Sequence, residues 1–136
     1  MKVKKPKIDS GLSKNIESDY LSFSWKYFER TQKFHLNRVK HTYVGQLIEK
    51  LHELSKKTEQ ELFQDHNLKR FFRLHPIDWK DTTENGFSNL PEKLLEQQPW
   101  QFSVTSNEHG RVHGFFIDST FYIVWFDPDH LLYSND

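Results

Sequence analysis

The last third of this 136-residue chain carries the pattern that most restricts its fold. Apolar and polar residues alternate over 100–105, and two further apolar segments follow at 111–117 and 120–126. A period of two residues is typical of a β-strand that buries one face. Polar, turn-forming residues separate the three segments at 107–110 and 118–119. The pattern therefore predicts three consecutive antiparallel strands.

The last of these strands is apolar at every position from Phe121 to Phe126. A strand without a polar face is buried on both sides, so we expect it at the centre of the sheet. Gly114 interrupts the strand before it and predicts a β-bulge that changes the direction of His113. Residues 127–129 end the last strand, and residues 130–133 are expected to form a short tail that docks on the edge of the sheet.

The middle of the chain predicts helices. Residues 21–27 alternate as one strand, and apolar residues then recur at helical spacing over 43–54, with Thr42 as the expected N-cap. Thr58-Glu59-Gln60-Glu61 has the form of a capping box. We therefore expect a second, shorter helix from Glu59 that ends near His66.

Residues 70–75 are predicted to form another strand, which Pro76 ends, and residues 76–99 are expected to be a long irregular loop with a short helix over 91–97. The predicted order is β-α-α-β-β-β-β. This order describes an α+β domain, in which an antiparallel sheet of four to five strands has a helical pair on one face. We expect a flexible basic leader over 1–19 and a single domain over 20–136.

Composition excludes several classes of protein. The chain has no Cys, so it has no disulfide, no thiolate zinc site and no Cys nucleophile. No apolar segment approaches the roughly 18 residues of a membrane span, and the basic N-terminus has no apolar core of a secretory signal. These features favour a cytoplasmic protein that does not associate with membranes.

Charge is balanced overall, with 19 Lys and Arg against 19 Asp and Glu, but unevenly distributed. Residues 1–50 hold 11 basic and 5 acidic residues, whereas residues 101–136 hold 1 and 5. Within the expected domain, the most basic stretch alternates with Phe34 and precedes Tyr43, an arrangement that could hold phosphates and stack a base. A solvated connection is the alternative. The candidate RNA-binding residues are Lys33, His35, Arg38, Lys40 and His41.

Two candidate constellations stand out at the strands. Arg111 and His113 are two residues apart on a strand and so project from one face, where they could bind phosphate; the alternative is a surface pair that flanks a bend at Gly114. His75 and Asp78 could act as a base and its orienting carboxylate. The alternative there is structural, with neighbouring apolar side chains pinning the loop to the core.

Metal and cofactor binding are not expected. His113, Asp127, Asp129 and His130 could in principle assemble a metal site, but no known ligand spacing supports one. A turn whose carboxylates accept hydrogen bonds from backbone N–H groups is favoured instead. No Gly-rich phosphate loop, nucleophile elbow or dinucleotide fingerprint is present.

The predicted element order, with its strand meander ending near a His and a Tyr, resembles that of the RelE/ParE-like small bacterial toxins over about residues 20–133. The segments His75–Trp79, Arg111–Phe115 and Asp127–Tyr133 also resemble a family of small bacterial and mobile-element proteins without an established activity. The toxin resemblance implies an endoribonuclease of a toxin–antitoxin or phage-defence system, with RNA or the ribosome as partner. It implies catalytic roles for Arg111, His113, His130 and Tyr133, with Glu108 or Asp129 as a base or orienting group.

A second hypothesis is a protein-binding module, such as an antitoxin, inhibitor or accessory protein that recognises a cognate protein. The acidic C-terminal third favours it, because such toxins are commonly basic around their site. Neither hypothesis predicts an oligomeric state.

Overall fold

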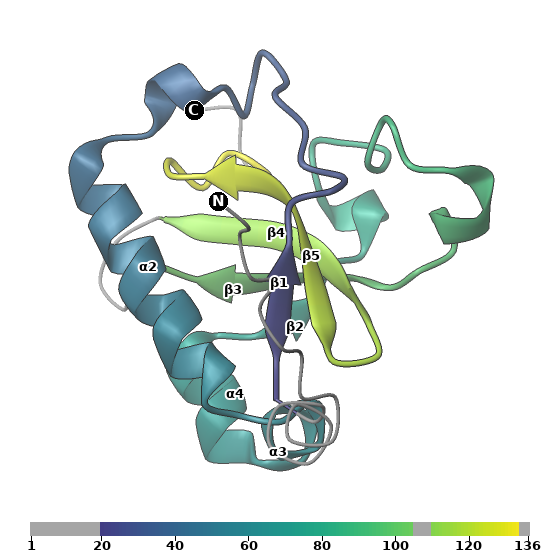
Figure 1. The fold of residues 1–136 in the computed structure, drawn as a ribbon. Helices are drawn as coiled ribbons and strands as arrows, with labels where there is room; N and C mark the ends of the chain where they lie inside the picture. Colours follow the sequence, from purple (N-terminus) through teal and green to yellow (C-terminus); the bar gives the residue numbers. More distant parts are fainter. Residues whose placement is uncertain (1–19, 105–109, 134–136) are drawn as a thin grey trace, which may run out of the picture.

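The computed structural model describes residues 20–104 and 110–133, which form a five-stranded mixed sheet with three α-helices on one face (Figure 1). The α+β class is thus confirmed, whereas the expected leader over 1–19 and most of the turn at 107–110 lie outside the described residues. The elements follow in the order β1 (Ser22–Ser24), 3-10 helix η1 (Leu36–Arg38), α2 (His41–Ser55), α3 (Glu59–Gln64), α4 (His66–Phe72), β2 (His75–Pro76), 3-10 helices η2 (Trp79–Asp81) and η3 (Glu92–Leu94), β3 (Pro99–Ser103), β4 (Arg111–Ile117) and β5 (Thr120–Asp127).

The strand order across the sheet is β1-β5-β4-β3-β2. The predicted antiparallel meander of β3, β4 and β5 is confirmed, and the connection from Ile117 to Thr120 is the expected two-residue hairpin. Two expectations are corrected. β1 pairs with β5 in parallel, so the sheet is mixed rather than antiparallel, and β4 rather than β5 is the central strand. β5 is apolar throughout although it is not central, because its side chains pack into an apolar cluster on each face of the sheet.

A register shift is present at the predicted place, between His113 and Gly114, but the extra residue is Val124 of β5, so the bulge does not change the direction of His113 as expected. Gly114 is required at this point: a Cβ there would collide with the carbonyl oxygen of Tyr122 and with the ring of Phe121. The shift leaves His113 opposite Trp125, on the face of the sheet away from the helices.

The capping box of α3 is confirmed, with Thr58 accepting from the backbone N–H of Glu61 and Glu61 reaching back to that of Thr58. The N-cap of α2, however, is Lys40 and makes no side-chain cap. The strand predicted at 70–75 is present only as the short β2 at His75–Pro76, and Pro76 belongs to it rather than ending it. Asp65 accepts hydrogen bonds from the backbone N–H groups of two following residues and so starts a third helix, α4, which runs to Phe72.

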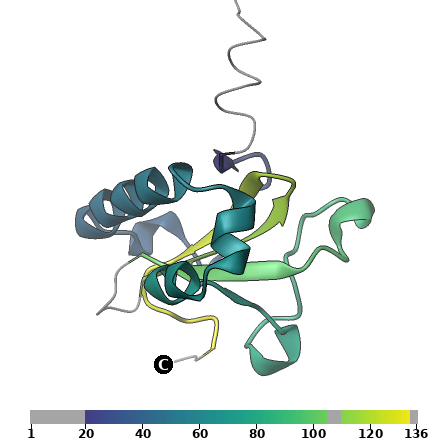
Figure 2. The same cartoon turned by 90° about the horizontal axis from the view of Figure 1, so that it is seen from below.

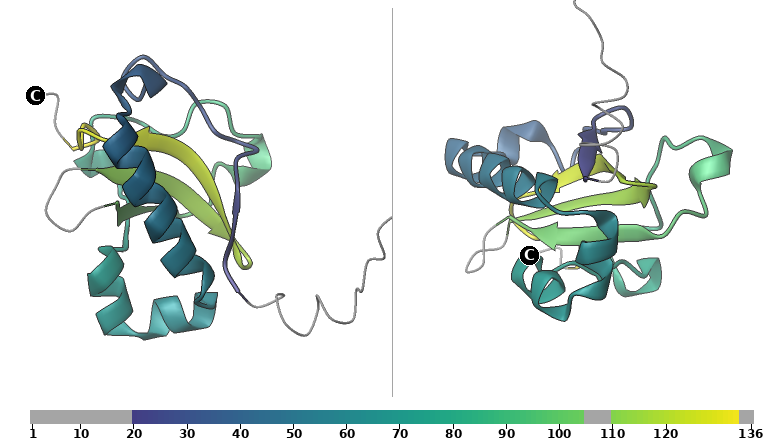
Figure 3. Two further views of the ribbon diagram at one scale, coloured as in Figure 1. Left: turned by 60° about the vertical axis from the view of Figure 1, so that its left-hand side comes forward. Right: turned by 60° about the horizontal axis from the view of Figure 1, so that its bottom comes forward.

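One face of the sheet packs against the helices. In the left view of Figure 3, α2 crosses in front of the strands. The cluster between them is apolar: Leu47, Leu54, Leu62, Phe72, Phe102, Val112, Phe121, Ile123 and Phe126 belong to it. The predicted apolar stripe of α2 is only partly buried, since Val44 and Ile48 are 39% and 61% exposed. We call this side the helix-covered face.

The opposite side, the loop-covered face, is covered by irregular segments, with η2 lying across the sheet from α2 (Figure 2). Its apolar cluster surrounds Trp125, whose ring stacks on Phe34 at 4.5 Å between centroids and is also contacted by Trp79 and Phe87. The segment 76–99 is therefore packed rather than loose, with Ile77 buried as the structural alternative proposed. The expected helix at 91–97 is the single turn η3.

Candidate functional site

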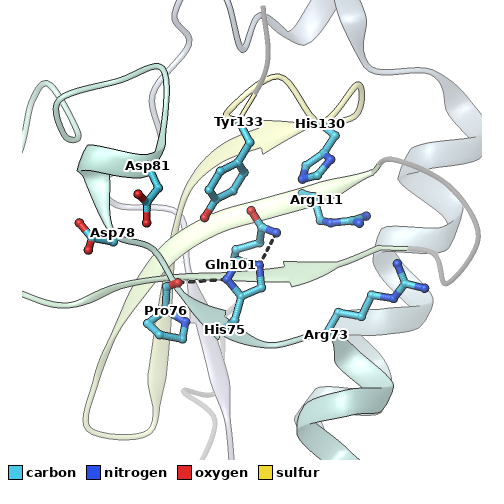
Figure 4. Close-up of a pocket in the computed structure, with 9 residues that line it drawn as sticks. All are labelled: Arg73, His75, Pro76, Asp78, Asp81, Gln101, Arg111, His130 and Tyr133. Atoms are coloured by element: carbon cyan, nitrogen blue, oxygen red, sulfur yellow. Dashed lines mark hydrogen bonds between the residues drawn. The ribbon is translucent and has the colours of Figure 1, made fainter.

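A pocket of about 460 Å³ opens on the loop-covered face, between the strand ends and the segments that follow β2 and β5 (Figure 4). Nine residues from five parts of the chain line it: Arg73, His75, Pro76, Asp78, Asp81, Gln101, Arg111, His130 and Tyr133. Eight of the nine are polar, aromatic or charged. A concave site with convergent polar groups of this kind is the usual form of a ligand site.

Charge in the pocket is separated. Arg73 and Arg111 lie on one side and Asp78 and Asp81 on the other, with Tyr133 between them (Figure 4). Burial lowers the pKa of Arg111, and the positive charge of Arg73 lowers it further. Two guanidinium groups that repel each other in this way make one end of the pocket attractive to an anion.

Arg111 is only 7% exposed, and hydrogen bonds hold its side chain and backbone in place. Nη1 donates to Ser103 Oγ at 3.1 Å and to Gly110 O at 3.0 Å, while the backbone oxygen of Arg111 accepts a hydrogen bond from the hydroxyl of Tyr43 at 2.7 Å. A buried guanidinium fixed from several directions is preorganised for a ligand and does not have to be ordered on binding.

His75 and Gln101 form the floor of the pocket. His75 Nδ1 lies 3.0 Å from Pro76 O, which can only accept, so Nδ1 carries the proton. His75 Nε2 then accepts from Gln101 Nε2 at 2.8 Å. Both ring nitrogens are engaged, which fixes the orientation of this imidazole.

Beside Gln101, on the neighbouring strand, His113 forms a buried pair with Asp127. His113 and Asp127 are 0% and 1% exposed at their side chains, and His113 Nε2 donates to Asp127 Oδ2 at 2.9 Å. Burial lowers the pKa of His113 despite the neighbouring carboxylate. Burial alone would raise the pKa of Asp127, but the hydrogen bonds from His113 and from the backbone of Leu131 and Leu132 hold it below its ordinary value. The expected turn with a carboxylate bound to backbone N–H groups is thus present at Asp127.

Two pocket residues have strained backbones. Arg73 and His130 have φ of 50° and 56°, in the left-handed region that residues with a Cβ rarely adopt. Arg73 ends α4 there, and His130 turns the chain after β5. Strain that persists at a pocket rather than being relieved by Gly is characteristic of functional sites.

The structure brings three of the four predicted catalytic residues together, since Arg111, His130 and Tyr133 all line the pocket. His113 is on the same face but fully buried, so it supports the floor and has no exposed surface for a substrate. Of the two suggested bases, Glu108 lies outside the described residues, and Asp129 pairs with Arg38 at 3.6 Å.

The predicted RNA-binding stretch does not join the pocket lining. Lys33 Nζ donates to Thr83 Oγ1 at 2.6 Å and pairs with Glu84 at 3.6 Å, and His35 caps η1. Lys40 and His41 begin α2. Of the five predicted RNA-binding residues, Lys33 is therefore paired with Glu84 and Arg38 with Asp129.

Sequence reasoning missed Arg73, Gln101 and Asp81 as site residues, and it weighed His75 and Asp78 only as a pair. Arg73 was assigned to a strand, which hid its place at the end of a helix. Gln101 could have been found, because it is a polar residue on the same strand face as Ser103, opposite the predicted His113 (Gln101 and His113 are Cα partners).

Within the described ranges, no group of three or more potential ligands is arranged to hold a metal ion, and no helix is both long and apolar enough to cross a bilayer. Comparison with protein-family models, with curated proteins and with solved structures finds no match to this chain.

Proposed function

We propose that this chain is an endoribonuclease that cleaves RNA in the pocket of Figure 4. The observation that carries the proposal is the pair of guanidinium groups, Arg73 and Arg111, at one end of an open pocket that also presents His130 and Tyr133. Such a set suits attack of a ribose 2′-hydroxyl on the neighbouring phosphodiester, because it offers both charge stabilisation and proton transfer.

Roles follow from the geometry. Arg111 and Arg73 would hold the phosphate and stabilise the extra negative charge of the phosphorane. His130 would take the proton of the 2′-hydroxyl, because it places a second imidazole in the pocket lining beside that of His75. Burial, followed by the charges of Asp81 and Asp78, raises the pKa of Tyr133, so its phenol stays protonated at neutral pH and can protonate the leaving 5′-oxygen.

The direct test is incubation of the purified protein with a labelled RNA oligonucleotide. We expect products that end in a 2′,3′-cyclic phosphate and a 5′-hydroxyl, and no cleavage where the scissile ribose is 2′-deoxy. Arg73→Ala, His130→Ala and Tyr133→Phe should each lower the rate by about 100-fold. Arg30→Ala is the matched control, because Arg30 is exposed and does not line the pocket, and this variant should cleave at the unchanged rate. An RNA that stays intact with the folded protein would disprove the proposal.

In the cell, such an activity in the cytoplasm would make the chain a toxin or phage-defence effector, in line with the resemblance to RelE-like toxins. Induction in a bacterial host should then arrest growth and fragment transcripts, with RNA or the ribosome as target. The Tyr133→Phe variant should permit growth.

One observation favours a protein-binding module as a second function. Val44 and Ile48, one helical turn apart on α2, are 39% and 61% exposed although both are apolar. A cognate partner that copurifies with the chain should be lost from an Ile48→Glu variant and kept by Arg73→Ala. If both variants lose the partner, or if both keep it, the partner does not bind through this surface of α2.

A further inference from the structure

Gln101 lines the floor of the pocket and carries a buried acceptor. The residue is 2% exposed, and its Oε1 makes no hydrogen bond within the described residues. Its Nε2 is committed to His75 at 2.8 Å, so the amide cannot rotate to offer a donor without breaking that bond. In Figure 4, Oε1 points up from the floor toward Tyr133. A buried acceptor left without a partner is costly, and a ligand N–H would satisfy it.

The side of the pocket opposite the two arginines carries two more acceptor groups. Asp78 and Asp81 both line the pocket. Burial is the main cause of the raised pKa of Tyr133, and the negative charges of Asp81 and Asp78 raise it further. Asp78 also caps η2, with Oδ1 accepting from Lys80 N at 3.3 Å, and pairs with Lys80 Nζ at 3.4 Å across an exposed contact. A ligand group placed between these carboxylates and Gln101 Oε1 therefore has to be rich in donors.

We infer that this end of the pocket is a guanine subsite, an inference that rests on the proposed cleavage of RNA. Guanine is the RNA base that places N–H groups on two neighbouring atoms, N1 and the exocyclic N2. Adenine and cytosine each offer one amino group beside a ring nitrogen that accepts, and uracil offers one N–H between two carbonyls. Against a surface of acceptors, each of these three bases places an acceptor atom of its own beside an acceptor of the pocket, which is repulsive. Guanine places a second donor there instead.

The two ends together define the ligand. The guanidinium groups of Arg73 and Arg111 take the phosphate, the acceptors of Asp78, Asp81 and Gln101 take the Watson–Crick edge, and the ring of Tyr133 lies between them. The substrate is therefore an RNA phosphodiester that follows a guanosine.

Binding of 3′-mononucleotides measures the subsite independently of catalysis. By calorimetry, we expect 3′-GMP to bind at least about tenfold more tightly than 3′-AMP. 3′-IMP, which lacks the N2 amino group, should fall between them. The exposed double variant Asp78→Asn/Asp81→Asn keeps the cap of η2, since Asn also caps helices, and should lose the preference for 3′-GMP. Asp65→Asn is the matched control, because Asp65 is an exposed helix cap outside the pocket, and it should bind as the wild type does.

Cleavage of a mixed-sequence RNA separates this inference from the proposed function. Cuts that follow guanosine support both. Cuts without a base preference, or equal affinity for 3′-GMP and 3′-AMP, overturn the guanine subsite and leave the nuclease standing. Selective binding of 3′-GMP by a protein that cuts no RNA overturns the nuclease and leaves the subsite, while absence of both binding and cleavage overturns both.

Discussion

The two faces of the sheet are built from different chemistry although the same strands supply them. On the helix-covered face, aromatic and aliphatic side chains such as Phe72, Phe102 and Val112 are at most 1% exposed. The six buried polar or charged residues of the described chain instead belong to the loop-covered side: Glu29, Gln101, Ser103, Arg111, His113 and Asp127. The helix-covered face therefore stabilises the fold mainly by apolar burial. On the loop-covered face, the desolvation of buried polar and charged groups offsets part of that stabilisation.

The largest expected effect on stability comes from the helix-covered face. Phe72→Ala removes a ring that is 1% exposed and leaves a cavity between α4 and the sheet, so the free energy of unfolding should fall by about 3–5 kcal/mol. Its neighbour Phe71 is 57% exposed, and Phe71→Ala should cost less than about 1 kcal/mol. Chemical denaturation of the two variants measures both values, and equal losses would contradict the assignment of Phe72 to the core.

On the loop-covered face, Asp127→Ala should lower the free energy of unfolding by about 3 kcal/mol, because it strips His113 and two backbone N–H groups of their acceptor. Asp129→Ala, two residues away, breaks only an exposed ion pair with Arg38 and should cost less than about 1 kcal/mol. A small loss in Asp127→Ala, comparable to that of Asp129→Ala, would show that the buried pair contributes little.

Low pH should destabilise the fold through groups on the loop-covered face, and high pH through a group on the helix-covered face. Because the pKa of His113 in the folded state is below its unfolded value, the unfolded chain binds more protons, and stability should fall below about pH 6.5. The lowered pKa of Asp127 acts in the same direction and adds a further loss below about pH 4. Thermal unfolding across pH should give a shallower acid slope for His113→Gln.

At the alkaline end, burial and then the charge of Asp127 raise the pKa of Tyr43, which packs on the helix-covered face. The folded chain holds this proton more tightly than the unfolded chain, so stability is present below about pH 10 and is lost as the pH rises further. Tyr43→Phe should remove that loss while keeping the acid slope. If Tyr43→Phe instead changes how stability depends on pH in acid, the titration of Tyr43 is coupled to that of His113 and Asp127 on the other face.

The smallest effect on stability should accompany a large effect on function. Arg73→Gly relieves the left-handed backbone at φ 50°, so the free energy of unfolding should rise by up to about 1 kcal/mol. The same change removes one guanidinium from the pocket and should lower RNA cleavage by about 100-fold. Asp118→Gly relieves a similar φ of 53° in the β4–β5 hairpin, away from the pocket, and should gain stability at unchanged cleavage.

How well the sequence predicted each part depended on whether the signal was local. The meander and the capping box at Thr58 were predicted correctly, since each depends on spacing within a few residues. The position of the register shift beside Gly114 was predicted too, but not that its extra residue belongs to β5. The parallel pairing of β1 and the helix α4 were not predicted. The composition of residues 70–75 suits a strand, but the Asp65 cap starts α4 one turn earlier and the helix runs to Phe72. Strand pairing begins only at His75.

The site was predicted in part for the same reason. Arg111, His130 and Tyr133 were found because their types and their proximity in sequence suggested a cluster, and the fold does bring them to one pocket. Arg73 and Asp81 reach that pocket from a helix end and from η2. No sequence spacing encodes such a meeting, because it depends on how distant segments pack.

The parallel pairing of β1 with β5 also sets the order in which the molecule can assemble. Ser22 lies beside Thr120, so this pair joins residues separated by almost the whole described chain. Closing so long a loop is entropically expensive and slow, which raises the contact order of the fold. During synthesis, α2, α3 and α4 can form early, whereas β1 has no strand to join until β5 has left the ribosome. The pairing of β1 is therefore the last step in the assembly of the sheet.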